Sequence, residues 1–169
     1  MGRNMMLLEY KRAVLIIDMG LRFPEENMPG VDFIIPDVNY LRGKEKDILG
    51  VVISHGHYDH IGAIPYLIDK ISSYGKNSSG KKRNFPPPIF ASPLTRGVIL
   101  RRMEDFPHLP KINITAVKDG SRIKLGPFQV EFFRQNHKKK KKDVCQNGAT
   151  FFSEYVNMVR PVQIKGFKI

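Results

Sequence analysis

Cysteine is nearly absent from this 169-residue chain, which contains only one. One cysteine cannot form a disulfide within the monomer, and it excludes a zinc site built mainly of thiolates. Long hydrophobic runs are also missing, because no apolar stretch approaches the roughly 20 residues that span a bilayer. The first residues lack the long apolar stretch and the small-residue cleavage site of a signal peptide. We therefore expect a soluble protein of a reducing, cytoplasmic compartment, with no membrane partner and no disulfide partner.

Acidic side chains are scarce relative to basic ones, 16 against 28, which gives a net charge of +12. Residues 1–137 carry 20 basic and 14 acidic side chains, and residues 138–169 carry 8 and 2, so each part contributes +6. The second part opens with five consecutive lysines at 138–142. A basic chain is compatible with a polyanionic partner, but solubility alone also explains it. The charge therefore does not decide the partner.

The composition is that of a globular protein, 41% hydrophobic and 26% charged, and predicted strands alternate with predicted helices as in an α/β fold. Apolar runs predict strands at 5–9, 13–18, 48–54, 89–91, 112–117, 122–125 and 128–134. Helical spacing predicts helices at 61–71, with Ile64, Leu67, Ile68 and Ile71 on one face, and at 94–103. Residues 21–37 and 72–88 are predicted loops, the second flexible and basic, and no regular structure is predicted after residue 137.

The most informative segment is Ser54-His55-Gly56-His57-Tyr58-Asp59-His60, which follows the predicted strand 48–54. It holds three of the five histidines of the chain and one aspartate. A lone histidine is more often a hydrogen-bonded polar residue than a ligand. Four potential ligands within six residues instead indicate a metal site.

The spacing gives each of these ligands a place. His55 and His57 are two residues apart at a strand end, so both side chains can project toward one metal. Asp59 and His60 follow where the chain turns into a helix and can reach a second metal. Imidazole and carboxylate ligands suit zinc without excluding manganese. Two metals about 3.5–4 Å apart can share a water and lower its pKa toward about 7.

Three further residues are less clear from the sequence. Asp18 ends the predicted strand 13–18 before a glycine, and it either orients a ligand by hydrogen bonding or is a plain turn residue. His137 stands beside the lysine run, where a solvated residue and a ligand are equally good interpretations. His108, between Pro107 and Leu109, is interpreted as a structural or surface residue.

The motif His55-x-His57-x-Asp59-His60 resembles the signature of the metallo-β-lactamase superfamily, and flanking segments resemble the ribonuclease J family over residues 2–137. The resembling segments are Gly2-Arg3-Asn4-Met5, Ile17 to Pro24, Gly30 to Asp37 and Ile61 to Leu67. Ribonucleases of this family process and degrade RNA. The resemblance implies an αββα sandwich, of which this chain would supply mainly the first sheet and its helices.

The resemblance also implies a zinc-dependent phosphodiesterase in which metal-bound hydroxide attacks an RNA phosphate. His55, His57 and His137 would hold one zinc, and Asp59 and His60 would contribute to the other. Asp59 would also serve catalysis by orienting the attacking water. No nucleic-acid-binding residue is fixed by the pattern. Basic residues that could contact phosphates, or simply form a solvated surface, are Lys81, Lys82, Arg83, Arg101 and Arg102.

The chain departs from the family after His137. The family's Gly-Asp motif, whose aspartate bridges the metals, does not occur in residues 138–169. We therefore expect residues 1–137 to be a partial metallo-β-lactamase domain and the front part of a longer enzyme. We expect residues 138–169 to be a divergent basic tail that is disordered or arises from a frameshift in a lysine-coding tract. On this interpretation the chain binds two zincs as in the complete family site, or only one.

Two alternatives stay open at this point. The first keeps the fold and changes the substrate to a small ester, thioester or lactam. The second is a zinc-binding fragment without catalytic activity, which the missing Gly-Asp motif favours for the isolated chain, while the family's function is assigned to the longer enzyme. The basic charge and the flanking segments favour RNA, while a preference for internal or terminal cleavage, the RNA target and the oligomeric state are not encoded in any motif.

Overall fold

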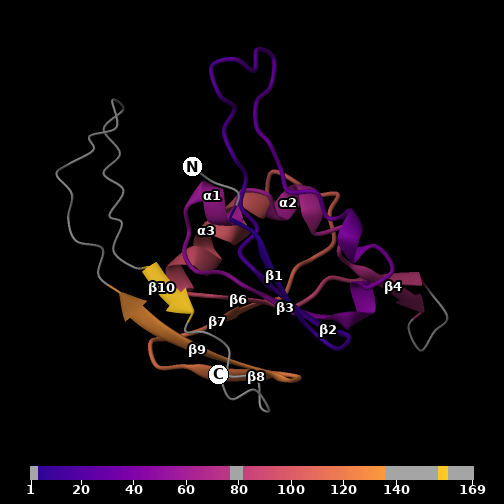
Figure 1. Cartoon of the computed structure of the whole chain (residues 1–169), viewed down its shortest axis with the longest axis vertical. Helices are drawn as coiled ribbons and strands as arrows, with labels where there is room; N and C mark the ends of the chain where they lie inside the picture. The colour runs from indigo at the N-terminus through magenta and orange to yellow at the C-terminus, as the bar shows by residue number, and fades with distance from the viewer. Residues whose placement is uncertain (1–3, 77–81, 136–155, 160–169) are drawn as a thin grey trace.

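The computed structural model describes residues 4–76, 82–135 and 156–159. Helices cover one face of a five-stranded sheet, and a three-stranded sheet covers the opposite face (Figure 1). This order of helix, sheet and sheet corresponds to three layers of the predicted αββα sandwich. The α/β fold class is confirmed, and the structure adds strands of a second sheet to the expected first sheet and helices.

The central sheet has the strand order β1-β2-β3-β6-β7. Its strands are β1 (Met6–Tyr10), β2 (Ala13–Ile17), β3 (Ile48–Val52), β6 (Ile89–Ala91) and β7 (Ile114–Ala116). β1 and β2 form the predicted antiparallel hairpin, and the pairs β2–β3, β3–β6 and β6–β7 are parallel. The carboxyl ends of β2, β3, β6 and β7 therefore meet at one edge, which also receives the amino end of β1. We call this edge the carboxyl edge and its opposite the amino edge.

The second sheet is antiparallel, with the order β10-β9-β8. Its strands are β8 (Arg122–Leu125), β9 (Phe128–Gln135) and β10 (Val156–Val159). β10 corrects the expectation that the tail has no regular structure, because residues 156–159 pair with residues 132–135 of β9. A four-residue apolar segment is too short to show a strand period by itself. The proposed domain boundary at residue 137 and the remainder of the tail lie outside the described residues.

The described residues also form three α-helices and two short 3-10 helices. They are α1 (Tyr58–Ile61), α2 (Ile64–Leu67), α3 (Pro93–Met103), η1 (Asn39–Leu41) and η2 (Glu45–Asp47). The prediction of one helix at 61–71 is wrong, because α1 and α2 are separate single turns. Pro65 lies in the first turn of α2 and has no N–H to continue a helix that enters from α1. No helix in the described part of the chain is long and apolar enough to cross a membrane.

A third correction concerns the segment 72–88, which was predicted to be a loop. It contains an antiparallel hairpin of β4 (Ser73–Lys76) and β5 (Lys82–Phe85) instead of a continuous loop. Its sequence is rich in glycine, serine and asparagine, which are as typical of a hairpin turn as of a loop. Residues 21–37 do form the predicted loop, with one isolated bridge between Arg22 and Ile34.

The alternation of side chains along the central strands divides the core in two. Val14 and Ile16 of β2 and Val51 of β3 face the helices and pack with the buried face of α2. Leu15 and Val52 face the second sheet and pack with Phe128, Val130 and Phe132 of β9. This period of two holds the strands rigidly between two apolar layers. The polar residues at the carboxyl edge are therefore attached to a well-packed support.

Candidate metal centre

The loops and the short helix at the carboxyl edge carry the predicted site residues. Asp18 follows β2, Ser54 to His57 follow β3, and Asp59 and His60 lie on α1. The five-residue strands place the last residues of β2 and β3 side by side, with Ile17 opposite Val52. The residues that follow each strand therefore emerge next to one another, although more than 30 residues separate them in the sequence.

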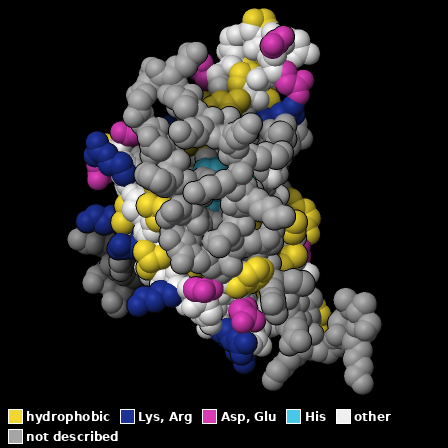
Figure 2. All heavy atoms as spheres, turned by 90° about the vertical axis from the view of Figure 1, so that its left-hand side faces the viewer, with side chains coloured by type: hydrophobic (Ala, Val, Ile, Leu, Met, Phe, Trp, Pro, Cys, Tyr) yellow, Lys and Arg dark blue, Asp and Glu magenta, His cyan; other side chains and the backbone are white. Residues whose placement is uncertain are grey.

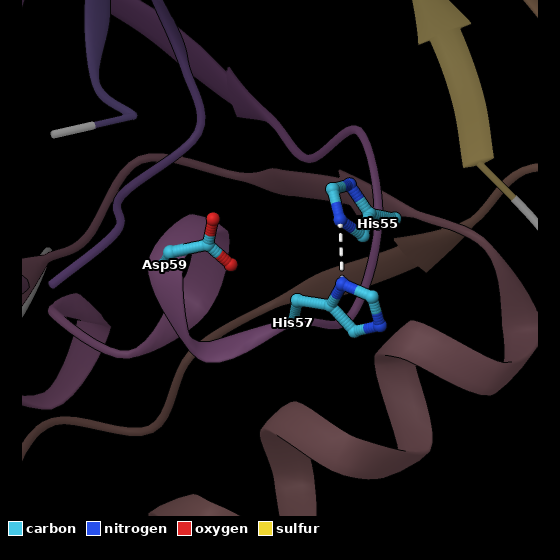
Figure 3. A group of neighbouring side chains, drawn as sticks. All are labelled: His55, His57 and Asp59. Atoms are coloured by element: carbon cyan, nitrogen blue, oxygen red, sulfur yellow. Dashed lines mark hydrogen bonds between the residues drawn. The ribbon is translucent and has the colours of Figure 1, made fainter. Parts of the chain in front are cut away.

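His55, His57 and Asp59 form a group able to hold a metal ion. Each offers one ligand atom, and these three atoms lie within 4.8 Å of one another. Figure 3 shows Asp59 reaching from α1 toward the two imidazoles on the loop after β3. The Nε2 atom of His55 lies 3.1 Å from the Nδ1 atom of His57. Two imidazoles and a carboxylate form a donor set that suits zinc and related divalent ions.

The surroundings keep His55 neutral and its lone pair available. Burial and the nearby imidazoles of His60 and His57 together lower the pKa of His55 to about 4, against the opposing effect of Asp18 and Asp59. The rings of His55 and His60 have their centroids only 3.9 Å apart. His57 is exposed, and histidine side chains are visible from outside the molecule in Figure 2. The group is thus reachable from solvent. At neutral pH the His55 ring is neutral, so one of its two nitrogens has a free lone pair for a metal.

His60 is held by a buried carboxylate. Its Nδ1 atom lies 2.8 Å from Oδ2 of Asp18, which is 6% exposed. Asp18 also accepts hydrogen bonds from the backbone N–H of Ser54 at 2.7 Å and from the Ser54 hydroxyl at 2.8 and 3.0 Å. A carboxylate can only accept, so Nδ1 of His60 carries the proton and Nε2 presents its lone pair. Asp18 is therefore hydrogen-bonded to a predicted ligand, and its role in orienting that ligand stays a prediction.

The backbone at Asp18 is shaped for this contact. Its φ is 59°, in the left-handed region that non-glycine residues seldom adopt. Aspartate tolerates this region better than most residues, and three donors from Ser54 and His60 hold its side chain in place.

Two site residues were missed by the sequence interpretation. Ser54 belongs to the motif segment, but the sequence pattern predicts no role for it. In the structure its hydroxyl links Asp18 with His55 and His60, whose Nδ1 atoms each lie 3.1 Å from the hydroxyl oxygen. Asn4 precedes β1, and its Nδ2 atom lies 3.0 Å from Oδ2 of Asp59 and 2.9 Å from Nε2 of His60. The signal for Asn4 was its position at the start of a hairpin whose other strand ends at Asp18.

The remaining predicted residues are placed as follows. His137 lies outside the described residues, so its role as a ligand stays a prediction. His108 is exposed beside the Phe106 ring, which agrees with a surface residue. Arg101 forms an ion pair with Glu104, and Arg102 pairs with Asp105 at 2.9 Å, so both guanidinium groups already have acidic partners.

The sequence profile of the Metallo-beta-lactamase superfamily matches residues 1–130. The chain belongs to this superfamily, as the motif and the layer order indicated. The match covers β1 to β8 and most of the described site.

Within this superfamily the chain is similar to proteins named Ribonuclease J. It is 37% identical to Ribonuclease J of Thermus thermophilus over 138 residues, which cover 80% of this chain and 22% of that protein. It is 35% identical to Ribonuclease J of Synechocystis over 138 residues, which cover 80% of this chain and 19% of that protein. The chain thus spans about a fifth of the length of these relatives.

Solved structures with a similar fold belong to proteins with names other than Ribonuclease J. A diphosphatase from the PhnP family has a TM-score of 0.48 at 17% identity, over 94% of this chain and 48% of that one. The metallo-beta-lactamase fold protein YhfI from Bacillus subtilis has a TM-score of 0.49 at 16% identity, over 80% and 47%. A shared fold does not determine a shared substrate.

Proposed function

We propose that this chain is part of a metal-dependent phosphodiesterase that cleaves RNA in the cytoplasm. The observation that carries the proposal is the group of His55, His57 and Asp59, supported by His60 on its Asp18 carboxylate. Its membership of the superfamily supports a metal-dependent hydrolase, and the similarity to proteins named Ribonuclease J supports RNA as the substrate. The partial domain 1–137 and the divergent tail 138–169 are part of the same proposal.

The donor set fits zinc. His55, His57 and Asp59 would hold the ion, with His60 and the undescribed His137 as further ligands of one or two zincs. When bound, zinc supplies Lewis-acid chemistry, which makes a nucleophile from water near neutral pH and stabilises negative charge that develops on a phosphate. The neutral state of His55 and the oriented Nε2 of His60 are the properties that such a ligand set requires.

The residues around the group orient the ring of His60 and determine which of its nitrogens carries the proton. Asp18 keeps the proton of His60 on Nδ1, and so fixes the tautomer and the direction of the ring. Ser54 supports the same carboxylate with both its backbone and its side chain. Asp59 is half-exposed and lies beside the imidazoles, where its carboxylate can also orient an attacking water.

A second candidate is a non-catalytic zinc-binding protein. One observation favours this candidate. In the described part of the chain, a single group of three residues has its ligand atoms close enough together to hold a metal. Such a chain would bind one zinc and would not turn over RNA, esters or lactams.

The deciding experiment follows cleavage of an end-labelled single-stranded RNA by the chain supplied with zinc. We expect cleavage that a chelator abolishes and that His57→Ala reduces at least 100-fold, since the variant removes an exposed ligand from the group. His108→Ala is the matched control, because His108 is also an exposed histidine but is not part of the group.

Three other outcomes would redirect the proposal. Equal cleavage by wild type and His57→Ala would show that the activity does not arise at this site. Hydrolysis of a small ester or lactam, without RNA cleavage, would keep the metal centre and change the substrate. One bound zinc per chain in metal analysis, without any turnover, would favour the non-catalytic protein.

A further inference from the structure

Asn4 connects the two residues that α1 contributes to the site. Its side-chain amide lies 3.0 Å from Oδ2 of Asp59 and 2.9 Å from Nε2 of His60. These two acceptor atoms are themselves 3.5 Å apart. The atom that faces an ionised carboxylate must be a donor, so the amide nitrogen and not the amide oxygen points at Asp59.

The two contacts of this amide respond differently to a metal. A carboxylate has about four lone-pair positions, so Asp59 can keep the Asn4 hydrogen bond while it binds an ion. The Nε2 atom of a neutral imidazole has one lone pair, so His60 cannot accept from Asn4 and bind an ion together. The bond to the carboxylate is also charge-assisted, and such bonds are roughly twice as strong as neutral ones. Asn4 should therefore act mainly through Asp59.

The backbone around Asn4 is fixed by close packing. The carbonyl oxygen of Asn4 accepts a hydrogen bond from the N–H of Gly20 at 3.0 Å. A Cβ atom at Gly20 would lie 1.6 Å from the carbonyl oxygen of Asp59, so the loop after β2 touches the α1 backbone directly. Asn4, Gly20 and Asp59 thus form one packed unit, and the amide of Asn4 approaches Asp59 from a rigid support.

From this geometry we infer that Asn4 is a positioning residue of the metal centre, which holds the Asp59 carboxylate within reach of the ligand nitrogens of His55 and His57. The inference rests on the proposed metal-binding function. It assigns a ligand-orienting role to the segment before β1, which contributes no predicted ligand. Removing a hydrogen-bond partner of a metal ligand commonly weakens metal binding 10- to 100-fold.

Zinc titration calorimetry of the 169-residue chain tests this inference. We expect Asn4→Ala to weaken zinc binding about tenfold, and we expect it to have no further effect when Asp59→Ala is already present. Asn39→Ala is the matched control, because the Asn39 amide also donates to a carboxylate, that of Asp37 at 3.3 Å, on an exposed turn. This control should bind zinc as the wild type does.

The outcomes separate the inference from the proposed function. A wild type that does not bind zinc refutes the metal centre and this inference together. A wild type that binds zinc, with Asn4→Ala binding equally or more tightly, refutes the inference alone and indicates that the amide merely competes for His60. If Asn4→Ala does not fold by circular dichroism, Asn4→Ser replaces it, and undiminished zinc binding by folded Asn4→Ser refutes the inference in the same way.

Discussion

The two edges of the central sheet hold their charged groups in different ways. At the carboxyl edge, Asp18 is buried and accepts from three donors on Ser54 and His60. At the amino edge, Glu9 accepts from Tyr40 and from Lys44, whose Nζ atom is 3.0 and 3.1 Å from the carboxylate. Arg12 and Asp47 form a second pair there at 3.5 Å, with the Arg12 side chain 89% exposed.

This difference indicates at which edge the stability of the fold depends on its charged groups. Exposed pairs gain little, because water and salt screen the charges and two long side chains must be ordered. A buried carboxylate that loses a donor is left with an unpaired charge, which is costly. The carboxyl edge is therefore expected to be sensitive to small changes, and the amino edge tolerant of large ones.

The largest effect is expected from Gly20→Ala. The added methyl would lie 1.6 Å from the Asp59 carbonyl oxygen, so the loop after β2 must move away from α1. We expect the variant to lose about 3 kcal/mol of unfolding free energy in urea denaturation, the upper end for overpacking a close contact. Gly97→Ala in α3 is the matched control, because nothing lies within 4 Å of its added methyl and helix propensity should raise stability by about 0.5–1 kcal/mol. Equal stabilities of the two variants would contradict the packing of this edge.

An intermediate effect is expected from acid at the carboxyl edge. The pKa of His55 is lowered to about 4 from an ordinary value of 6.5, mainly by burial. Between these values the unfolded chain binds the proton and the folded chain does not, so stability must fall as the pH drops from 6.5 toward 4. With chelator present, we expect His55→Gln to lose less unfolding free energy than wild type between pH 7.5 and pH 4.5. The difference should be on the order of 1 kcal/mol because partial exposure screens the charge. Parallel losses would show that His55 titrates normally.

The smallest effect is expected from Glu9→Gln at the amino edge. Hydrogen bonds from Tyr40 and Lys44 lower the pKa of Glu9, so its contribution is present above the ordinary pKa of 4.5 and is lost as the pH falls. Because the pair is solvated, the variant should shift the thermal midpoint at pH 7 by less than Gly97→Ala does, and 1 M salt should remove even that shift. A loss comparable to that of Gly20→Ala would abolish the distinction between the two edges.

Local patterns predicted most of the fold and the ligand cluster. The apolar runs of β2 and β3 and the apolar face at Ile64, Leu67, Ile68 and Ile71 are patterns among neighbouring residues, and the structure buries that face. The His55 to His60 segment is likewise contiguous. The separation of α1 from α2 and the pairing of β4 with β5 were missed, because turn-rich composition and short helical periods fit more than one structure.

The support of the site could not be predicted in the same way. Asn4 and Asp59 are 55 residues apart, and Asp18 and Ser54 are 36 apart. Their contacts depend on which strands are neighbours in the sheet, and no local period encodes that order. A role for Asp18 was left open for this reason, and the structure adds its hydrogen bonds with His60 and Ser54.

The loop after β2 and the α1 segment are joined by main-chain hydrogen bonds, from Met19 N–H to His60 at 2.7 Å and from Ala63 N–H to Met19 at 2.9 Å. These amides can exchange with solvent only when α1 separates from the first hairpin. On the proposed function, an ion bound to Asp59 and His60 would stabilise the closed arrangement by mass action and would therefore slow that opening. The exchange rates of these two amide protons, on Met19 in the loop after β2 and on Ala63 just after α1, would then report ligand binding at the carboxyl edge.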